Sequence, residues 1–170
     1  MRERRVSLGT LCGLALALFL VRPAAGQSLA ELQTHFDREN NSVHKARLLE
    51  KLGDAQFEVT RQASKAGDHA TVALTFEKYR DNARAALQLL KKQHPDAERQ
   101  SNGYRQLQFH VRRAIREVDE SLLMAADEFK PPLQLVRADL IRMDDEMIML
   151  LFPGHPQKPA KTPSPTEKQL

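Results

Sequence analysis

Three residues near the start of the chain have the types and spacing of a metal site. Glu31, His35 and Glu39 follow one another at intervals of four residues, which places them on one side of a helix. An imidazole and two carboxylates are ligands that zinc accepts in proteins. The stripe holds no fourth ligand, so a row of solvated charges is the alternative explanation. No resident cofactor is predicted.

Methionine side chains, which can bind a soft metal, are concentrated at 143–149. Met143, Met147 and Met149 lie close together, and thioethers are ligands for Cu(I). Met143 and Met147 also fit the apolar side of a helix, where methionine fills gaps in a core. We therefore predict that these two belong to the core, and we keep a metal- or ligand-handling protein as the alternative function.

Carboxylates are numerous at 117–120 and 144–146, but they do not have the pattern of a catalytic pair. Acid–base catalysis needs two carboxyl groups held at a defined separation in a cleft. Neighbouring acids on a helix point in different directions, and these follow arginines at helical spacing, which favours ion pairs within the helix. The sequence has no glycine-rich phosphate loop and no nucleophile motif. We predict that the protein is not an enzyme.

Apolar residues that fall off the main helical stripes are candidates for binding a partner. Phe109, Ile115 and Met149 are three such residues. An exposed strip of apolar side chains marks a site where another protein binds. Burial under the first helix is the alternative for the same three residues. The predicted partner is another protein of the cell envelope or a second copy of the chain.

Helices must position all of these residues. Apolar residues recur at alternating steps of three and four, which is typical of amphipathic helices. A capping box at Ser28 predicts the start of a short first helix, and Pro95 forbids the continuation of a later one. Four long helices are expected near 43–66, 69–93, 104–125 and 131–150.

The apolar spacing also predicts the fold class. A stripe that repeats every ~3.5 residues favours helices that pack at shallow crossing angles, as in coiled coils. The segment 27–152 is long enough for one domain with its own core. We predict an all-α domain over 27–152, an antiparallel up-down helical bundle of four long helices plus one short N-terminal helix.

Residues 1–26 have the pattern of a signal peptide. Three arginines precede an apolar run of 16 residues from Val6 to Val21, and small residues follow at 24–26. The run is shorter than the roughly 20 residues that a membrane-spanning helix needs. We predict cleavage after Gly26 and export to the periplasm or the extracellular space. In the alternative, an uncleaved signal anchors the domain in the inner membrane, which would be its only membrane contact.

Charge and cysteine content exclude several classes of protein. The formal net charge is +4, but residues 1–26 carry four arginines and one glutamate, so the remainder carries only +1. Nucleic-acid binding requires a persistent basic face, and we do not expect it. Cys12 is the only cysteine and lies in the predicted signal peptide. The mature chain is therefore expected to lack disulfides and thiolate metal sites.

Residues 153–170 differ in composition from the rest of the chain. They are rich in proline and lysine and have few apolar residues. Such a segment cannot form a core, and we predict an extended, disordered tail. A spacer or an attachment to an anionic surface is one role for it, and a solvated terminus is the other.

Glycines at two places resemble features of known helical families. Leu52-Gly53 and Gly67-Asp68 resemble the helical hairpins of tetratricopeptide repeats. The region 44–92 also looks like the helical hairpins of several exported bacterial families of unknown function. This resemblance implies a helical-hairpin architecture and no particular activity.

Taken together, these patterns predict an exported helical protein that acts as a noncatalytic binding or scaffolding module of the cell envelope. The motivation is a nearly neutral amphipathic domain without thiols or catalytic motifs. The alternative is a periplasmic metal- or ligand-handling helical protein, built on Glu31, His35 and Glu39 or on the methionines.

Overall fold

The computed structural model describes residues 28–154, which form five α-helices and one short 3₁₀-helix. The helices are α1 (Leu29–Arg38), α2 (Ser42–Lys65), α3 (His69–Gln93), α4 (Ser101–Met124) and α5 (Lys130–Leu151), with η1 at Asp127–Phe129. This range contains no strand and no helix that is apolar over a length sufficient to cross a membrane. The predicted all-α fold is confirmed. The predicted signal peptide and the tail from 155 onward lie outside the described residues.

Local sequence signals begin and end the helices. The hydroxyl of Ser28 accepts a hydrogen bond from the backbone nitrogen of Glu31 at 3.2 Å, and the Glu31 carboxylate accepts one from the backbone nitrogen of Ser28 at 2.9 Å. This is the predicted capping box. Asn41 and Asp68 cap α2 and α3 with their side chains, and each such cap stabilises a helix by about 1 kcal/mol. Gly67, with φ of 75°, reverses the chain between these two helices.

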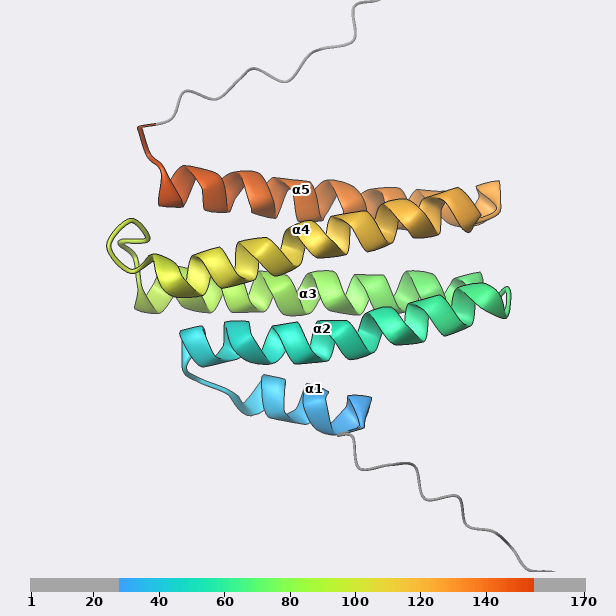
Figure 1. The fold of residues 1–170 in the computed structure, drawn as a ribbon, viewed down its shortest axis with the longest axis horizontal. Helices are drawn as coiled ribbons and strands as arrows, with labels where there is room; N and C mark the ends of the chain where they lie inside the picture. The colour runs from blue at the N-terminus through green and yellow to red at the C-terminus, as the bar shows by residue number, and fades with distance from the viewer. Residues whose placement is uncertain (1–27, 155–170) are drawn as a thin grey trace, which may run out of the picture.

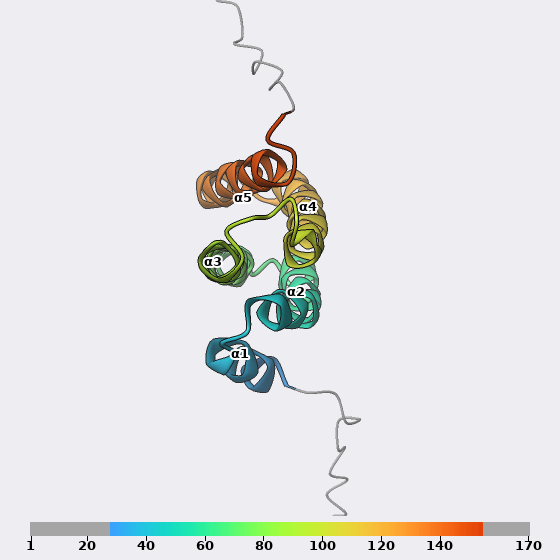
Figure 2. The same cartoon turned by 90° about the vertical axis from the view of Figure 1, so that its left-hand side faces the viewer.

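The long helices are arranged in two layers. They lie side by side in Figure 1, and the end-on view in Figure 2 shows α2 and α4 in one layer and α3 and α5 in the other. Contacts across the layers join α2 to α3 and α4 to α5, and contacts within the layers join α2 to α4 and α3 to α5. The short helix α1 packs on α2. In the part of the chain that the structure describes, α2 and α5 do not contact each other.

The core lies between the two layers and is built from all four long helices. Its largest fully buried side chains include Tyr79, Tyr104, Phe57, Phe76, Leu107, Leu140 and Met147. Met143 is also buried, so the prediction that Met143 and Met147 belong to the core is confirmed. Helix α2 contacts three helices, α1, α3 and α4, and therefore buries a wider side than a single apolar stripe predicts.

Helix α1 is too short to cover the whole of α2. It has 10 residues, whereas α2 has 24, and Figure 1 shows it beside only part of α2. Val59, in the C-terminal half of α2, is only partly buried. Ala83 on α3 is fully buried.

These two positions give a test of the packing. Aspartate in place of Ala83 would put an uncompensated charge in the core, and we expect the Ala83→Asp change to lower the free energy of unfolding by about 3–5 kcal/mol. Val59→Asp should cost much less, since its carboxylate can reach water. Urea denaturation followed by circular dichroism measures both, and equal losses would contradict this packing.

Candidate functional site

The three predicted metal ligands do not form a metal site in the part of the chain that the structure describes. Glu31 lies in the first turn of α1, and its carboxylate is used in the capping box. Glu39 follows the end of α1, and its carboxylate accepts a hydrogen bond from the backbone nitrogen of Asn41 at 2.7 Å and lies 2.8 Å from Nδ1 of His44. The hydrogen bond from Asn41 lowers the pKa of Glu39. Both carboxylates therefore stabilise helix ends.

His35, the third predicted ligand, is exposed on α1. It lines a shallow cavity of about 210 Å³ with Thr34, Arg38 and Glu39. Among residues 28–154, no group of three or more His, Cys, Asp or Glu side chains is arranged to hold a metal ion. His35 and Glu39 line the same cavity, but the set of three is not assembled, because α1 ends at Arg38 and the carboxylates of Glu31 and Glu39 bind backbone nitrogens at the two ends of this helix.

The three predicted partner-binding residues do not form one strip. Phe109 is exposed on α4, and Met149 is half-exposed on α5. Ile115 is partly buried and packs against the core. Six positions separate Phe109 from Ile115 on α4, so the two side chains point to different sides of that helix. Phe109 and Met149 contribute apolar surface on two different helices.

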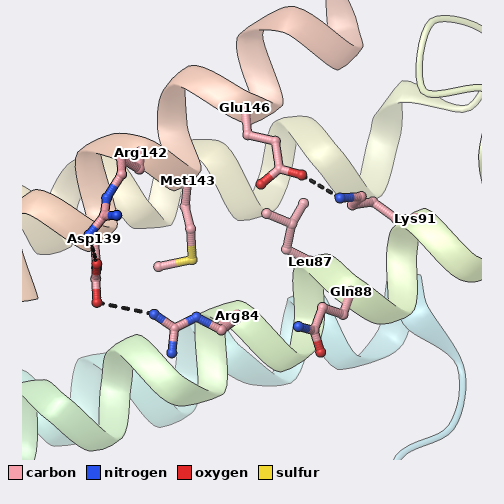
Figure 3. A pocket seen from close by; sticks show the side chains of 8 residues that line it. All are labelled: Arg84, Leu87, Gln88, Lys91, Asp139, Arg142, Met143 and Glu146. Atoms are coloured by element: carbon pink, nitrogen blue, oxygen red, sulfur yellow. Dashed lines mark hydrogen bonds and ion pairs between the residues drawn. The ribbon is translucent and has the colours of Figure 1, made fainter.

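A groove between α3 and α5 is the candidate binding site. It encloses a cavity of about 300 Å³ (Figure 3). Its lining residues are Arg84, Leu87, Gln88 and Lys91 of α3 and Asp139, Arg142, Met143 and Glu146 of α5. Leu87 and Met143 are buried and lie between the charged side chains, which come from both helices. The groove therefore has charged walls and an apolar centre.

Three arginines converge on one carboxylate in this groove. Arg84 donates to Oδ2 of Asp139 at 3.1 Å, and Arg142 pairs with the other oxygen, Oδ1. Nε of Arg80 lies 3.8 Å from Oδ2. Asp81 accepts from Arg80 at 2.9 Å and from Arg84 at 3.4 Å. We call these five residues the arginine cluster. Three guanidinium groups face two carboxylates, which leaves one positive charge in excess.

The arginine cluster has the chemistry to bind an acidic group. A guanidinium presents a planar set of donors that matches a carboxylate or phosphate. The Arg84 side chain is 44% exposed, and that of Arg142 is largely exposed. Figure 3 shows both pointing toward Asp139 from opposite sides of the groove. An ion pair between Lys91 and Glu146 links the same two helices at the other end of the groove.

A second polar group of residues lies where α2, α3 and α4 meet, and its histidine and tyrosine are buried. His110 of α4 is only 3% exposed. Its Nδ1 lies 2.8 Å from the hydroxyl of Tyr79, and its Nε2 lies 3.4 Å from Oδ1 of Asp54. Arg113 pairs with the same oxygen of Asp54 at 2.7 Å. A carboxylate can only accept, so the neutral ring donates from Nε2 to Asp54 and accepts the hydroxyl hydrogen of Tyr79 at Nδ1.

Burial controls protonation in this network. It lowers the pKa of His110 below the ordinary 6.5, although Asp54 acts in the opposite direction. Burial also raises the pKa of Tyr79 well above its ordinary value, so the hydroxyl remains a donor. Tyr79 is 0% exposed and His110 3%, so neither side chain is open to solvent. The network joins three helices.

Gly53 makes room for the network. A Cβ atom at this position would lie 2.3 Å from Cε1 of His110 and 2.9 Å from Cε2 of Tyr79, much closer than atoms can approach. The phenyl ring of Phe57 stacks on the imidazole of His110 with a centroid separation of 5.5 Å. Sequence reasoning missed His110 because it falls off the apolar stripe of α4. Gly53, a glycine in the interior of a long helix, was the signal in the sequence that another side chain approaches the backbone there.

The lowered pKa of His110 predicts how stability depends on pH. As pH falls below about 6.5, the unfolded chain binds a proton at this histidine that the folded chain does not, so the free energy of unfolding decreases. Above that pH the contribution is fully present. Thermal unfolding at about pH 7.5 and 5.5 should show a larger loss in wild type than in His110→Gln, which retains the other histidines. An equal loss in both would contradict a buried neutral imidazole.

The close contact at Gly53 gives a second prediction. Overpacking in Gly53→Ala should cost about 1–3 kcal/mol, and the gain of about 1 kcal/mol that alanine brings to a helix interior offsets part of this cost. We therefore expect the free energy of unfolding to fall by up to about 2 kcal/mol. Gly154→Ala is the control, since no atom lies within 4 Å of a Cβ added there. Chemical denaturation of both variants measures the difference, and a stabilised Gly53→Ala protein would refute the close approach.

The groove between α3 and α5 and the network around His110 are the two polar sites of the described residues that we consider for a function. The predicted relation to helical-hairpin families stays a prediction. Comparison of this chain with protein-family models, with curated proteins and with solved structures finds no match.

Proposed function

We propose that this chain is a noncatalytic, exported helical protein that binds an acidic segment of another protein of the cell envelope. The arginine cluster on the groove between α3 and α5 carries this proposal. Asp139 satisfies part of the donor capacity of Arg80, Arg84 and Arg142, and the excess positive charge favours a further carboxylate at the same place. The buried Leu87 and Met143 between the walls would accept an apolar neighbour of that carboxylate.

The fold supports a binding role through its arrangement. We infer that the four long helices form two stacked hairpins, α2 with α3 and α4 with α5, as a more open form of the predicted antiparallel up-down bundle. In a closed bundle the first and last long helices pack on each other, whereas α2 and α5 are not in contact within residues 28–154. Stacked hairpins leave surface grooves between helices of adjacent hairpins, as between α3 and α5.

We also propose that the protein is located in the cell envelope, because residues 1–26 have the sequence pattern of a signal peptide. The absence of enzymatic activity is also proposed, and it is supported by the closure of the Tyr79–His110 pair to solvent. Two observations on residues 28–154 disfavour the metal-handling alternative: Glu31 and Glu39 are engaged at helix ends, and Met143 and Met147 are buried in the core.

A charge reversal in the groove tests the proposed binding. Arg84→Glu places a negative charge in the arginine cluster, and we expect it to weaken binding of a fluorescently labelled glutamate-rich peptide at least about tenfold, equivalent to ~1.4 kcal/mol. Fluorescence anisotropy measures the binding, which should also weaken with added salt.

Arg61→Glu is the matched control for this experiment. Arg61 is 43% exposed, close to the 44% of Arg84, and it also pairs with two carboxylates, those of Glu58 and Glu117, but it lies on α2 away from the groove. Its variant should keep most of the wild-type affinity. Failure of the wild-type chain to bind the peptide, or equal weakening in both variants, would refute the groove as an acidic-segment site.

A further inference from the structure

Helix α5 is the last helix of the stack, and one side of it is exposed. Seven of the exposed positions recur at alternating steps of four and three, so they form a single stripe along the helix and its C-cap residue, and the exposed Gln134 lies beside this stripe. We call this the outer stripe. It consists of Pro131, Leu135, Ala138, Arg142, Asp145, Met149 and Phe152.

The outer stripe is more apolar than an ordinary solvent-facing side of a helix. Leu135 is 66% exposed, and Met149 and Phe152 are each about half-exposed. Ile141 and Ile148 lie along one edge of the stripe and are partly exposed. A helix that is apolar on both sides normally packs on both sides. One side of α5 packs on α3 and α4, and the outer stripe is suited to a further helix.

We propose that the outer stripe of α5 binds the same stripe of a second copy of this chain, in an antiparallel, two-fold symmetric dimer. This inference goes beyond the proposed binding of an acidic segment and does not depend on it. In an antiparallel helix pair with this spacing, each position of one helix faces the complementary position of the other. A two-fold interface must be complementary to itself.

The outer stripe meets that requirement. When the helices are aligned so that Arg142 faces Asp145 of the second copy, Ala138 faces Met149 of the second copy, and Leu135 faces Phe152 of the second copy. A small residue then lies opposite a large one, and two large apolar residues pack together. At the centre, Arg142, which also pairs with Asp139 of its own chain, meets Asp145 of the second copy. Symmetry repeats each of these contacts, so the interface has two central ion pairs.

Charge selects this arrangement over the alternatives. A parallel pair of the same helices would place Arg142 against Arg142 and Asp145 against Asp145, which is unfavourable at close range. The edge of the stripe on the groove side carries Asp139 and Glu146, which would approach their copies in the dimer. Cations of α3 already pair with both of these carboxylates, which reduces repulsion between the two copies.

A charge exchange tests the dimer with the purified chain alone. Sedimentation velocity over a range of concentrations should show a reversible dimer for wild type. Arg142→Asp sets two acids against each other at each central pair, and Asp145→Arg sets two bases against each other, so each variant should be monomeric under the same conditions. An equimolar mixture of the two variants restores both opposite-charge pairs and should form a mixed dimer.

A pair of leucines provides the matched control. Leu135 of the outer stripe and Leu74 of α3 are both 66% exposed. Leu135→Arg should weaken dimerisation at least about tenfold, while Leu74→Arg should leave it unchanged. Unaltered far-ultraviolet circular dichroism of each variant shows that the fold is retained.

Two results would overturn the proposal. The first is a wild-type chain that remains monomeric at every concentration. The second is a dimer that persists in Arg142→Asp, Asp145→Arg and Leu135→Arg alike, since the interface would then lie elsewhere. Because no ligand is present, either result leaves the acidic-segment proposal to be decided by its own peptide-binding experiment.

Discussion

The close approach of α4 to α2 at Gly53 is the contact on which the rest of the arrangement depends. It joins one helical hairpin to the other, because α2 is paired with α3 and α4 with α5. The missing side chain at Gly53 lets the imidazole of His110 lie against the backbone of α2, where Tyr79 and Asp54 hold both of its nitrogens. Together with the direct contacts and ion pairs between α3 and α5, this contact holds the groove between those two helices.

The network around His110 and the arginine cluster differ in their exposure to solvent. In the buried network each ring nitrogen of His110 has one partner suited to the neutral form, and burial keeps it in that form. In the arginine cluster, three guanidinium groups share two carboxylates and remain in contact with solvent. A satisfied, enclosed network stabilises a unique packing, whereas an exposed cluster with excess charge retains the capacity to bind an oppositely charged group.

Local structure could be predicted from the sequence, while the sites depend on contacts between distant segments. The bounds of α3 agree with the prediction because Asp68 and Pro95 act on the backbone next to them. The metal stripe at Glu31, His35 and Glu39 was not assembled, since the last of these follows the helix and binds the backbone ahead of α2. Periodicity gives one apolar side for each helix, so it could not show that α2 has three neighbours or that arginines of α3 meet Asp139 of α5.

The layered arrangement also has a consequence for how the chain reaches its folded state. Helices that adjoin in sequence make the most extensive contacts, α2 with α3 and α4 with α5. Domains rich in such local contacts have low contact order and fold quickly. The pairing of Asp54 with His110 spans 56 positions, so loop-closure entropy opposes it more than the hairpin contacts. Folding of this domain is then best described as rapid formation of two hairpins, with their docking at Gly53 as the step that the entropy of the chain slows.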